Sequence, residues 1–354
     1  MKFKLDKFLL ISIIILCLCL VYGVILYSLP PEKMEKYYVN TVYSSIRYIW
    51  GNLSFFSVFP LSYYWILFQL IFILILIYLH VFGDLSFWKG FQKCLGLLIL
   101  HLSFFYYLWG FNYLRVPLNE RLSLDHEIER KDFEREINNT TQDLCHLRAG
   151  LEADSMILDF QAVEEHLRSL VKSTFKELLV VGLDRVRVRV LRPEGCLLVF
   201  GTAGIYWPFS GEGYVDAGLD SLIIPFTMAH ELAHGFGWTD EGECNFVALL
   251  ACRKSNSKMI RYSAELSYWK YLMNNASRLD PKLFHRYSEE ISNSIKFDLK
   301  SIDNHADKFP EILPALRDWL YDTYLKLNGV EGGSNSYSGM VKWVINYQNK
   351  GNSK

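Results

Sequence analysis

Residues 225–234 read Pro-Phe-Thr-Met-Ala-His-Glu-Leu-Ala-His and contain the pattern His-Glu-x-x-His. On a helix, His230 and His234 project from one face, one turn apart. Two imidazoles at that spacing can share a tetrahedral zinc ion and leave positions for a third ligand and a water molecule. Glu231 lies beside the first histidine, where it can take a proton from zinc-bound water and pass it to a leaving amine. The motif therefore predicts the active-site helix of a zinc metallopeptidase.

The residues around the motif favour a metal site over a chance match. Pro225 stands before the helix, and four apolar residues make the remaining helix surface apolar: Met228, Ala229, Leu232 and Ala233. A buried active-site helix requires such a surface, whereas a helix exposed to solvent does not.

A third metal ligand is expected shortly after the motif. Gly-Phe-Gly at residues 235–237 ends the helix, and a new helix can begin just beyond it. Glu241 and Asn245 are four residues apart on that helix and resemble the ExxxD/N pattern of gluzincins, in which the Glu binds zinc and the Asp or Asn orients a ligand. If the helix starts late, Glu243 is the ligand instead. Both glutamates are therefore candidate ligands.

The first third of the chain is expected to lie in a membrane. The chain has 354 residues, of which 51% are hydrophobic, and most of the apolar excess comes before Phe111. Three apolar runs, at about 8–29, 61–82 and 94–111, have lengths that suit helices crossing a bilayer. Pro-Pro-Glu follows the first run in place of a small-residue cleavage site, so we expect an uncleaved anchor. Residues 1–114 are thus predicted to form a membrane domain.

The placement of basic residues predicts the orientation. Five lysines would face the cytoplasm: Lys2, Lys4, Lys7, Lys89 and Lys93. Five basic residues would lie on the other side: Lys33, Lys36, Arg47, Arg115 and Arg121. The first helix usually decides the orientation. Three crossings then place everything after Arg115 outside the cytoplasm.

Residues 115–354 read as one α+β domain, mostly helical and zincin-like. Helical patterns come first, then Val186, Val188 and Val190 alternate as in a half-buried strand, and 196–200 reads as a short strand. The segment 204–216 contains Pro208 and predicts an irregular or edge strand. It is either an edge to which a peptide substrate adds as a further strand or a core hairpin filled with aromatic side chains.

Charge and cysteine content exclude other classes of protein. The net charge is −1 and no basic face stands out, so we expect no nucleic-acid partner. The seven cysteines show no CxxC spacing, which argues against a disulfide scaffold or a cysteine zinc site.

A donor for the developing oxyanion would complete such an active site. Tyr337 is our candidate, with Tyr206 and His285 as others, although a buried tyrosine commonly makes a structural hydrogen bond instead. His80 and His101 lie in or near the second and third spans. A proton relay is one interpretation, but a neutral histidine that is simply accommodated there is the simpler one.

The chain also resembles a bacterial family of unknown function, namely three-span membrane proteins with an HExxH domain of the gluzincin-like metallopeptidase type. The resemblance covers most of the chain and rests on these segments: 109–113, 206–212, 225–227, 241–246, 324–326 and 336–337. The family's acidic stretch usually reads Arg-Glu-Asp-Glu-Ala-Asn-Phe, whereas Asp240, Gly242 and Cys244 replace its Arg, Asp and Ala here. Both glutamates and the Asn are kept. The resemblance implies a peptidase fold and a place in the bacterial inner membrane, but it names no substrate.

The sequence therefore leads to one main hypothesis. Zn²⁺ is held by His230, His234 and either Glu241 or Glu243, and Glu231 acts as general base on a peptide or protein substrate. The alternative is a zinc-binding membrane scaffold or sensor without catalysis, which would have no use for Glu231. The sequence does not indicate an oligomeric state.

Overall fold

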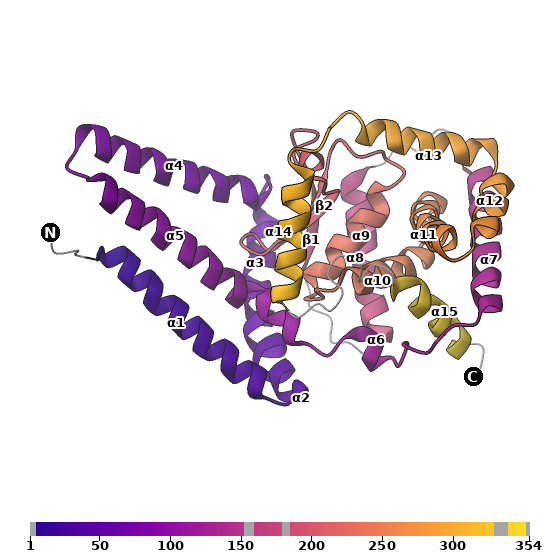
Figure 1. The fold of residues 1–354 in the computed structure, drawn as a ribbon, viewed down its shortest axis with the longest axis horizontal. Coiled ribbons are helices and arrows are strands. Elements are labelled where there is room, and N and C mark those ends of the chain that lie inside the picture. Colours follow the sequence, from indigo (N-terminus) through magenta and orange to yellow (C-terminus); the bar gives the residue numbers. More distant parts are fainter. Residues whose placement is uncertain (1–4, 152–158, 179–184, 329–338, 352–354) are drawn as a thin grey trace. The chain divides into compact units, whose positions relative to one another are not determined.

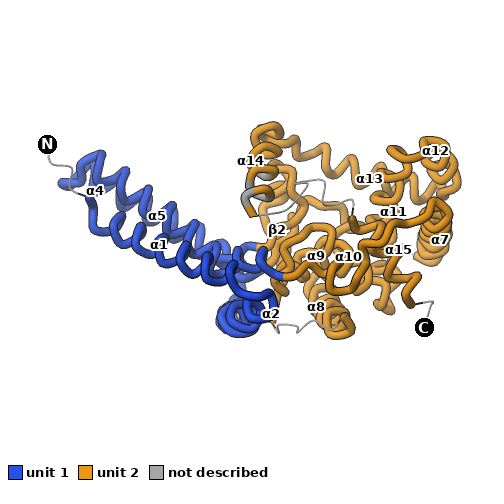
Figure 2. Tube along the Cα trace, turned by 60° about the horizontal axis from the view of Figure 1, so that its bottom comes forward, with its two compact units in different colours: residues 1–115, 207–212 blue, residues 116–206, 213–354 orange. Residues whose placement is uncertain are grey.

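A computed structural model describes residues 5–151, 159–178, 185–328 and 339–351 (Figure 1). The chain divides into two compact units (Figure 2). Unit 1 comprises residues 1–115 together with 207–212, and unit 2 comprises 116–206 together with 213–354. The chain thus passes from unit 2 into unit 1 for six residues and returns.

Unit 1 contains three helices that are long and apolar enough to cross a membrane: α1 (Lys7–Ser28), α4 (Leu61–Phe82) and α5 (Phe87–Leu108). The three predicted spans are confirmed at this level, and the chain has the pattern of a multi-pass membrane protein. Between α1 and α4 lie α2 (Pro31–Met34), the π-helix η1 (Glu35–Tyr43) and α3 (Ser44–Phe56).

The third span differs from the predicted range of 94–111. Ser86 caps α5 by accepting a hydrogen bond from the amide of Lys89, so the helix begins at Phe87, earlier than the apolar run suggested. The helix ends at Leu108, and a 3-10 helix, η2 (Gly110–Leu114), follows. The predicted start was late because Lys89 and Lys93 interrupt the apolar run within the first two turns.

The turn at 207–212 belongs to unit 1 through several buried contacts. Glu212 is fully buried and accepts hydrogen bonds from the Leu61 amide at 2.8 Å and from the Ser54 hydroxyl. The carboxylate therefore lies at the N-terminus of α4, where the helix dipole favours negative charge. Arg47 donates to the carbonyl of Gly211, and the ring of Trp65 lies 5.4 Å from that of Trp207.

Unit 2 is mostly helical around a small sheet, as predicted. Its three strands, β1 (Arg187–Leu191), β2 (Gly204–Trp207) and β3 (Glu212–Asp216), have the order β1-β3-β2, so β2 is an edge strand next to β3. The predicted strand at 196–200 is wrong, because residues 198–200 form a 3-10 helix, η4 (Leu198–Phe200). The buried Asp216 carboxylate accepts hydrogen bonds from the backbone amides of Gly195, Leu197 and Leu198. These bonds hold residues 195–198 in a turn.

The remaining elements of unit 2 described by the structure are mostly α-helices. These helices are α6 (Leu118–Arg121), α7 (Arg130–Ala149), α8 (Phe160–Glu177), α9 (Ile224–Gly235), α10 (Glu241–Arg253), α11 (Lys258–Leu279), α12 (Pro281–Glu290), α13 (Asn293–Ala306), α14 (Pro314–Leu327) and α15 (Gly339–Gly351). Helix α9 carries the motif and packs against α8, α10, α11 and β1 (Figure 1). The core beside it includes Phe175, Trp238 and Phe246, each less than 2% exposed. The motif helix is therefore buried, as its apolar surface predicted.

Candidate metal centre

Helix α9 presents both histidines of the motif to one point. The Nε2 atoms of His230 and His234 lie 3.0 Å apart. The helix ends at Gly235, and Gly237 takes a positive φ of 83°, a conformation that glycine adopts without strain. Asp240 then caps α10 by accepting a hydrogen bond from the amide of Glu243 at 3.0 Å. This sharp connection brings the first turn of α10 back beside the histidines.

Glu241 is the acidic residue that joins the two histidines. Its Oε2 atom lies 3.0 Å from His230 Nε2 and 3.5 Å from His234 Nε2. The potential ligand atoms of these three residues all lie within 4.8 Å of one another, so the group could hold a metal ion. Burial opposes charge on Glu241, but the facing imidazoles hold the pKa of its carboxyl well below its usual range. The anionic form, which binds metal cations, is therefore favoured.

The outer nitrogen atoms of both histidines have their own partners. His230 Nδ1 lies 2.8 Å from Asn245 Oδ1, and His234 Nδ1 lies 2.8 Å from the carbonyl of Trp238. Both acceptors call for a proton on Nδ1, which leaves the lone pair of Nε2 directed at the shared point. Asn245 in turn donates to the hydroxyl of Tyr271 at 3.1 Å.

Two of these partners were missed in the sequence. Trp238 contributes a main-chain carbonyl, which no side-chain pattern reveals. Tyr271 lies on α11, far along the chain, and only the packing of α11 on α10 brings it to Asn245.

Glu243 points elsewhere. Its carboxylate is only 3% exposed and accepts hydrogen bonds from the backbone amides of Leu118 and Asn119, the latter at 3.4 Å. These amides belong to the first turn of α6, so the carboxylate stabilises the start of that helix. The geometry thus favours Glu241 over Glu243 as a ligand.

Glu231 is a buried acid beside the cluster. It is 4% exposed, and its Oε2 atom has no hydrogen-bond partner among the described residues. Burial raises the pKa of its carboxyl to about 7, although His230 and His234 act in the opposite direction. Two glycines make room for it: a Cβ atom on Gly204 would lie 2.6 Å from Glu231 Oε1, and one on Gly213 would lie 2.9 Å from Glu231 Cβ.

The candidate oxyanion donors are placed as follows. Tyr337 lies outside the described residues, and His285 is exposed on α12. Tyr206 is buried in β2, and a Cβ atom on Gly235, the residue after His234, would lie 3.3 Å from its ring. His80 contacts the carbonyl of Leu85, and His101 contacts Gln69, which agrees with accommodated histidines. All seven cysteines are free thiols.

Comparison with known proteins gives one match. The model of a family described as "Protein of unknown function (DUF3810)" matches residues 38–345, which is most of the chain. No curated protein and no solved structure matches. The match agrees with the resemblance seen in the sequence as far as a family of unknown function is concerned, and it does not extend to a gluzincin assignment.

Substitution of each glutamate separately should identify the third ligand. Glu241→Ala removes one of three donors, so bound zinc should fall from about one ion per chain to near zero. Glu243→Ala should keep the zinc but cost about 1–3 kcal/mol of stability, because two backbone amides lose their acceptor. Elemental analysis and thermal unfolding of the full chain measure both effects. Zinc kept in Glu241→Ala and lost in Glu243→Ala would assign the ligand to Glu243.

Tyr271 should act on the metal through Asn245 and His230. Asn245→Ala should weaken zinc binding by roughly 10–100-fold, as loss of a partner of a metal-bound histidine does. Tyr271→Phe should produce a smaller loss in the same direction, because Asn245 stays but is held less firmly. Competition with a chelator of known affinity measures this, with Tyr287→Phe on α12 as the matched control. Equal affinities in both phenylalanine variants would show that Asn245 needs no such tether.

Proposed function

The chain belongs to DUF3810, a family of proteins of unknown function, and we propose that it is a membrane-anchored zinc-dependent metallopeptidase. One observation carries this proposal. Three potential metal ligands converge, and beside them a buried carboxylate keeps one oxygen without a partner among the described residues. A structural metal site would need only the ligands, and burying an additional unpaired carboxylate costs several kcal/mol.

The donor set suits zinc. Two imidazoles and one carboxylate are the ligands of many catalytic zinc sites, which keep a further position for water or substrate. His230, His234 and Glu241 would hold the ion. When bound, zinc supplies Lewis acidity that polarises a carbonyl and makes water a usable nucleophile near neutral pH.

Glu231 would carry the proton in this reaction. Burial raises the pKa of its carboxyl, whereas a cation bound beside it would lower that pKa, so a loaded site would favour the carboxylate form that accepts a proton. The carboxylate accepts a proton from the attacking water and then donates it to the nitrogen of the leaving amine. Asn245 and the Trp238 carbonyl keep the two imidazoles oriented while this happens.

A peptide substrate fits the neighbouring sheet. Strand β2 is an edge strand, and its first residue, Gly204, lies against the Glu231 carboxylate. An extended peptide that pairs with the main chain of an edge strand would bring its own backbone to this carboxylate. Strand β2 lies at the edge of the sheet and β3 is buried throughout, and addition of a peptide to β2 stays a prediction.

The proposal extends to location. The three apolar helices suggest a multi-pass membrane protein, and we place it in a bacterial inner membrane with unit 2 outside the cytoplasm. The alternative function, a zinc-binding scaffold or sensor, would use the same membrane anchor and the same metal ligands but no general base.

Glu231→Gln separates the enzyme from the scaffold. The amide cannot accept a proton, so cleavage of a quenched fluorescent peptide library by the full chain should fall at least about 100-fold, while zinc content stays at the wild-type level. His126→Ala, at an exposed histidine in the loop before α7, is the control for unspecific damage. Wild-type cleavage rates in Glu231→Gln would refute the general-base role.

Reporter fusions test the orientation. A phosphatase that is active only outside the cytoplasm should be active when fused after Tyr113, and inactive when fused at Asp84 between α4 and α5. The first helix and its lysines set this direction. The opposite pattern would place unit 2 in the cytoplasm and change the pool of substrates.

A further inference from the structure

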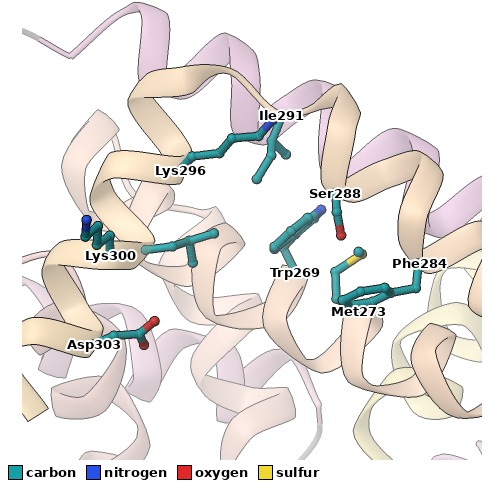
Figure 3. Close-up of a pocket in the computed structure, with 9 residues that line it drawn as sticks. Trp269, Met273, Phe284, Ser288, Ile291, Lys296, Lys300 and Asp303 are labelled. Atoms are coloured by element: carbon teal, nitrogen blue, oxygen red, sulfur yellow. The ribbon is translucent and has the colours of Figure 1, made fainter. Parts of the chain in front are cut away.

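A second site lies in unit 2, apart from the metal cluster. Residues of helices α11, α12 and α13 line a pocket of about 410 Å³ that is open to solvent (Figure 3). Its volume falls in the range of pockets that bind small molecules, roughly 300–1,000 Å³. None of the candidate metal ligands, nor Glu231, lines it. A ligand bound here would therefore not occupy the proposed active site.

The floor of the pocket is mostly apolar. Trp269 and Met273 lie four residues apart on α11, so both face the same side of that helix, and they are 5% and 4% exposed. Ile291, just after α12, is 5% exposed, and Phe284 of α12 lies beside Met273 (Figure 3). The indole N–H of Trp269 already donates to Thr141 at 3.1 Å. The ring therefore offers the pocket an apolar surface and no free donor.

The mouth of the pocket is cationic. Lys296 and Lys300 are four residues apart on α13 and lie along the same edge, with Asp303 further on. All three are exposed, and within the described part of the chain their side chains make no ion pair or hydrogen bond. Two positive charges and one negative charge leave the mouth with a net charge of +1. Lysines of this kind attract an anion without fixing its geometry.

We propose that this pocket binds an amphiphile in which a hydrocarbon chain ends in an anionic group. The hydrocarbon would lie on Trp269, Met273 and Phe284, and the headgroup would face Lys296 and Lys300. Met273 suits such a ligand, because a thioether side chain adapts to a flexible hydrocarbon. A carboxylate and a phosphate monoester could each pair with the two lysines at the mouth. A fatty acid and an alkyl phosphate are therefore the two ligands to be distinguished.

Photolabelling of the full chain in lipid nanodiscs tests the proposal. The probe is hexadecanoate with a diazirine in its chain, and the adducts are mapped by peptide mass spectrometry. We expect adducts on the peptides that carry Trp269, Met273 and Phe284, with the labelling of α1, α4 and α5 as an internal reference. The matching diazirine alcohol should label the pocket about tenfold less, because it lacks the charge that the lysines attract.

Two variants address the two halves of the pocket. Lys296→Glu with Lys300→Glu should reduce labelling about tenfold, since two attractions become repulsions. Ser288→Trp should reduce it by filling the cavity without changing charge. The double variant Lys176→Glu with Lys308→Glu alters exposed lysines that do not line the pocket and should leave labelling unchanged.

Competition then identifies the source of the anion. Unlabelled hexadecanoate and hexadecyl phosphate are added in turn, and the better competitor names the headgroup. Equal labelling by the acid and the alcohol, labelling unchanged in the pocket variants, or adducts confined to the membrane helices would each overturn the proposal. The zinc content and peptidase activity of the lysine variants report separately on the metal cluster.

Discussion

The candidate site depends on the contact between the Glu241 carboxylate of α10 and the Nε2 atoms of the two motif histidines of α9. Two histidines on one helix can supply only two ligands, so the third donor has to come from another element. Helix α10 provides it because the chain reverses within a few residues, through Gly237 with its positive φ and the Asp240 cap. Asn245 follows one turn later on α10 and bonds to His230. The candidate third ligand and the residue that bonds to His230 thus come from one helix.

The buried carboxylate of Glu231 is a second constraint on the packing around α9. Its neighbours must leave it space and keep most water away. Gly204 and Gly213 leave space for the Glu231 side chain, because a larger residue at either position would collide with it. The packing of α8, α10 and α11 against α9 keeps most water away from this carboxylate. A buried carboxylate with a raised pKa is costly in free energy, and such costs are found mostly where chemistry requires them.

The helical parts of this arrangement followed from the sequence, because they depend on local patterns. The spacing of His230 and His234, the break at 235–237 and the shared face of Glu241 and Asn245 are all properties of one or two helices. The choice between Glu241 and Glu243 needed the structure, since it depends on where α10 begins and on the amides of α6, which lie more than a hundred residues earlier. The prediction of a strand at 196–200 was wrong for a similar reason. Its apolar pattern is local, but the Asp216 carboxylate that turns the segment is distant in sequence.

The turn between β2 and β3 belongs to the membrane unit, which the sequence did not indicate. Residues 207–212 are part of unit 1, although both neighbouring segments belong to unit 2. Glu212 binds the first amide of α4 and the hydroxyl of Ser54, and Arg47 binds the adjacent carbonyl of Gly211. A fragment that begins near residue 115 would remove all of these partners and leave a buried carboxylate without hydrogen bonds, which costs about 1–3 kcal/mol or more. Strands β2 and β3, which flank this turn, also carry the two glycines beside Glu231. Loss of the membrane helices would therefore disturb the hairpin that shapes the candidate site, and the metal content and activity of this protein have to be measured on the full chain.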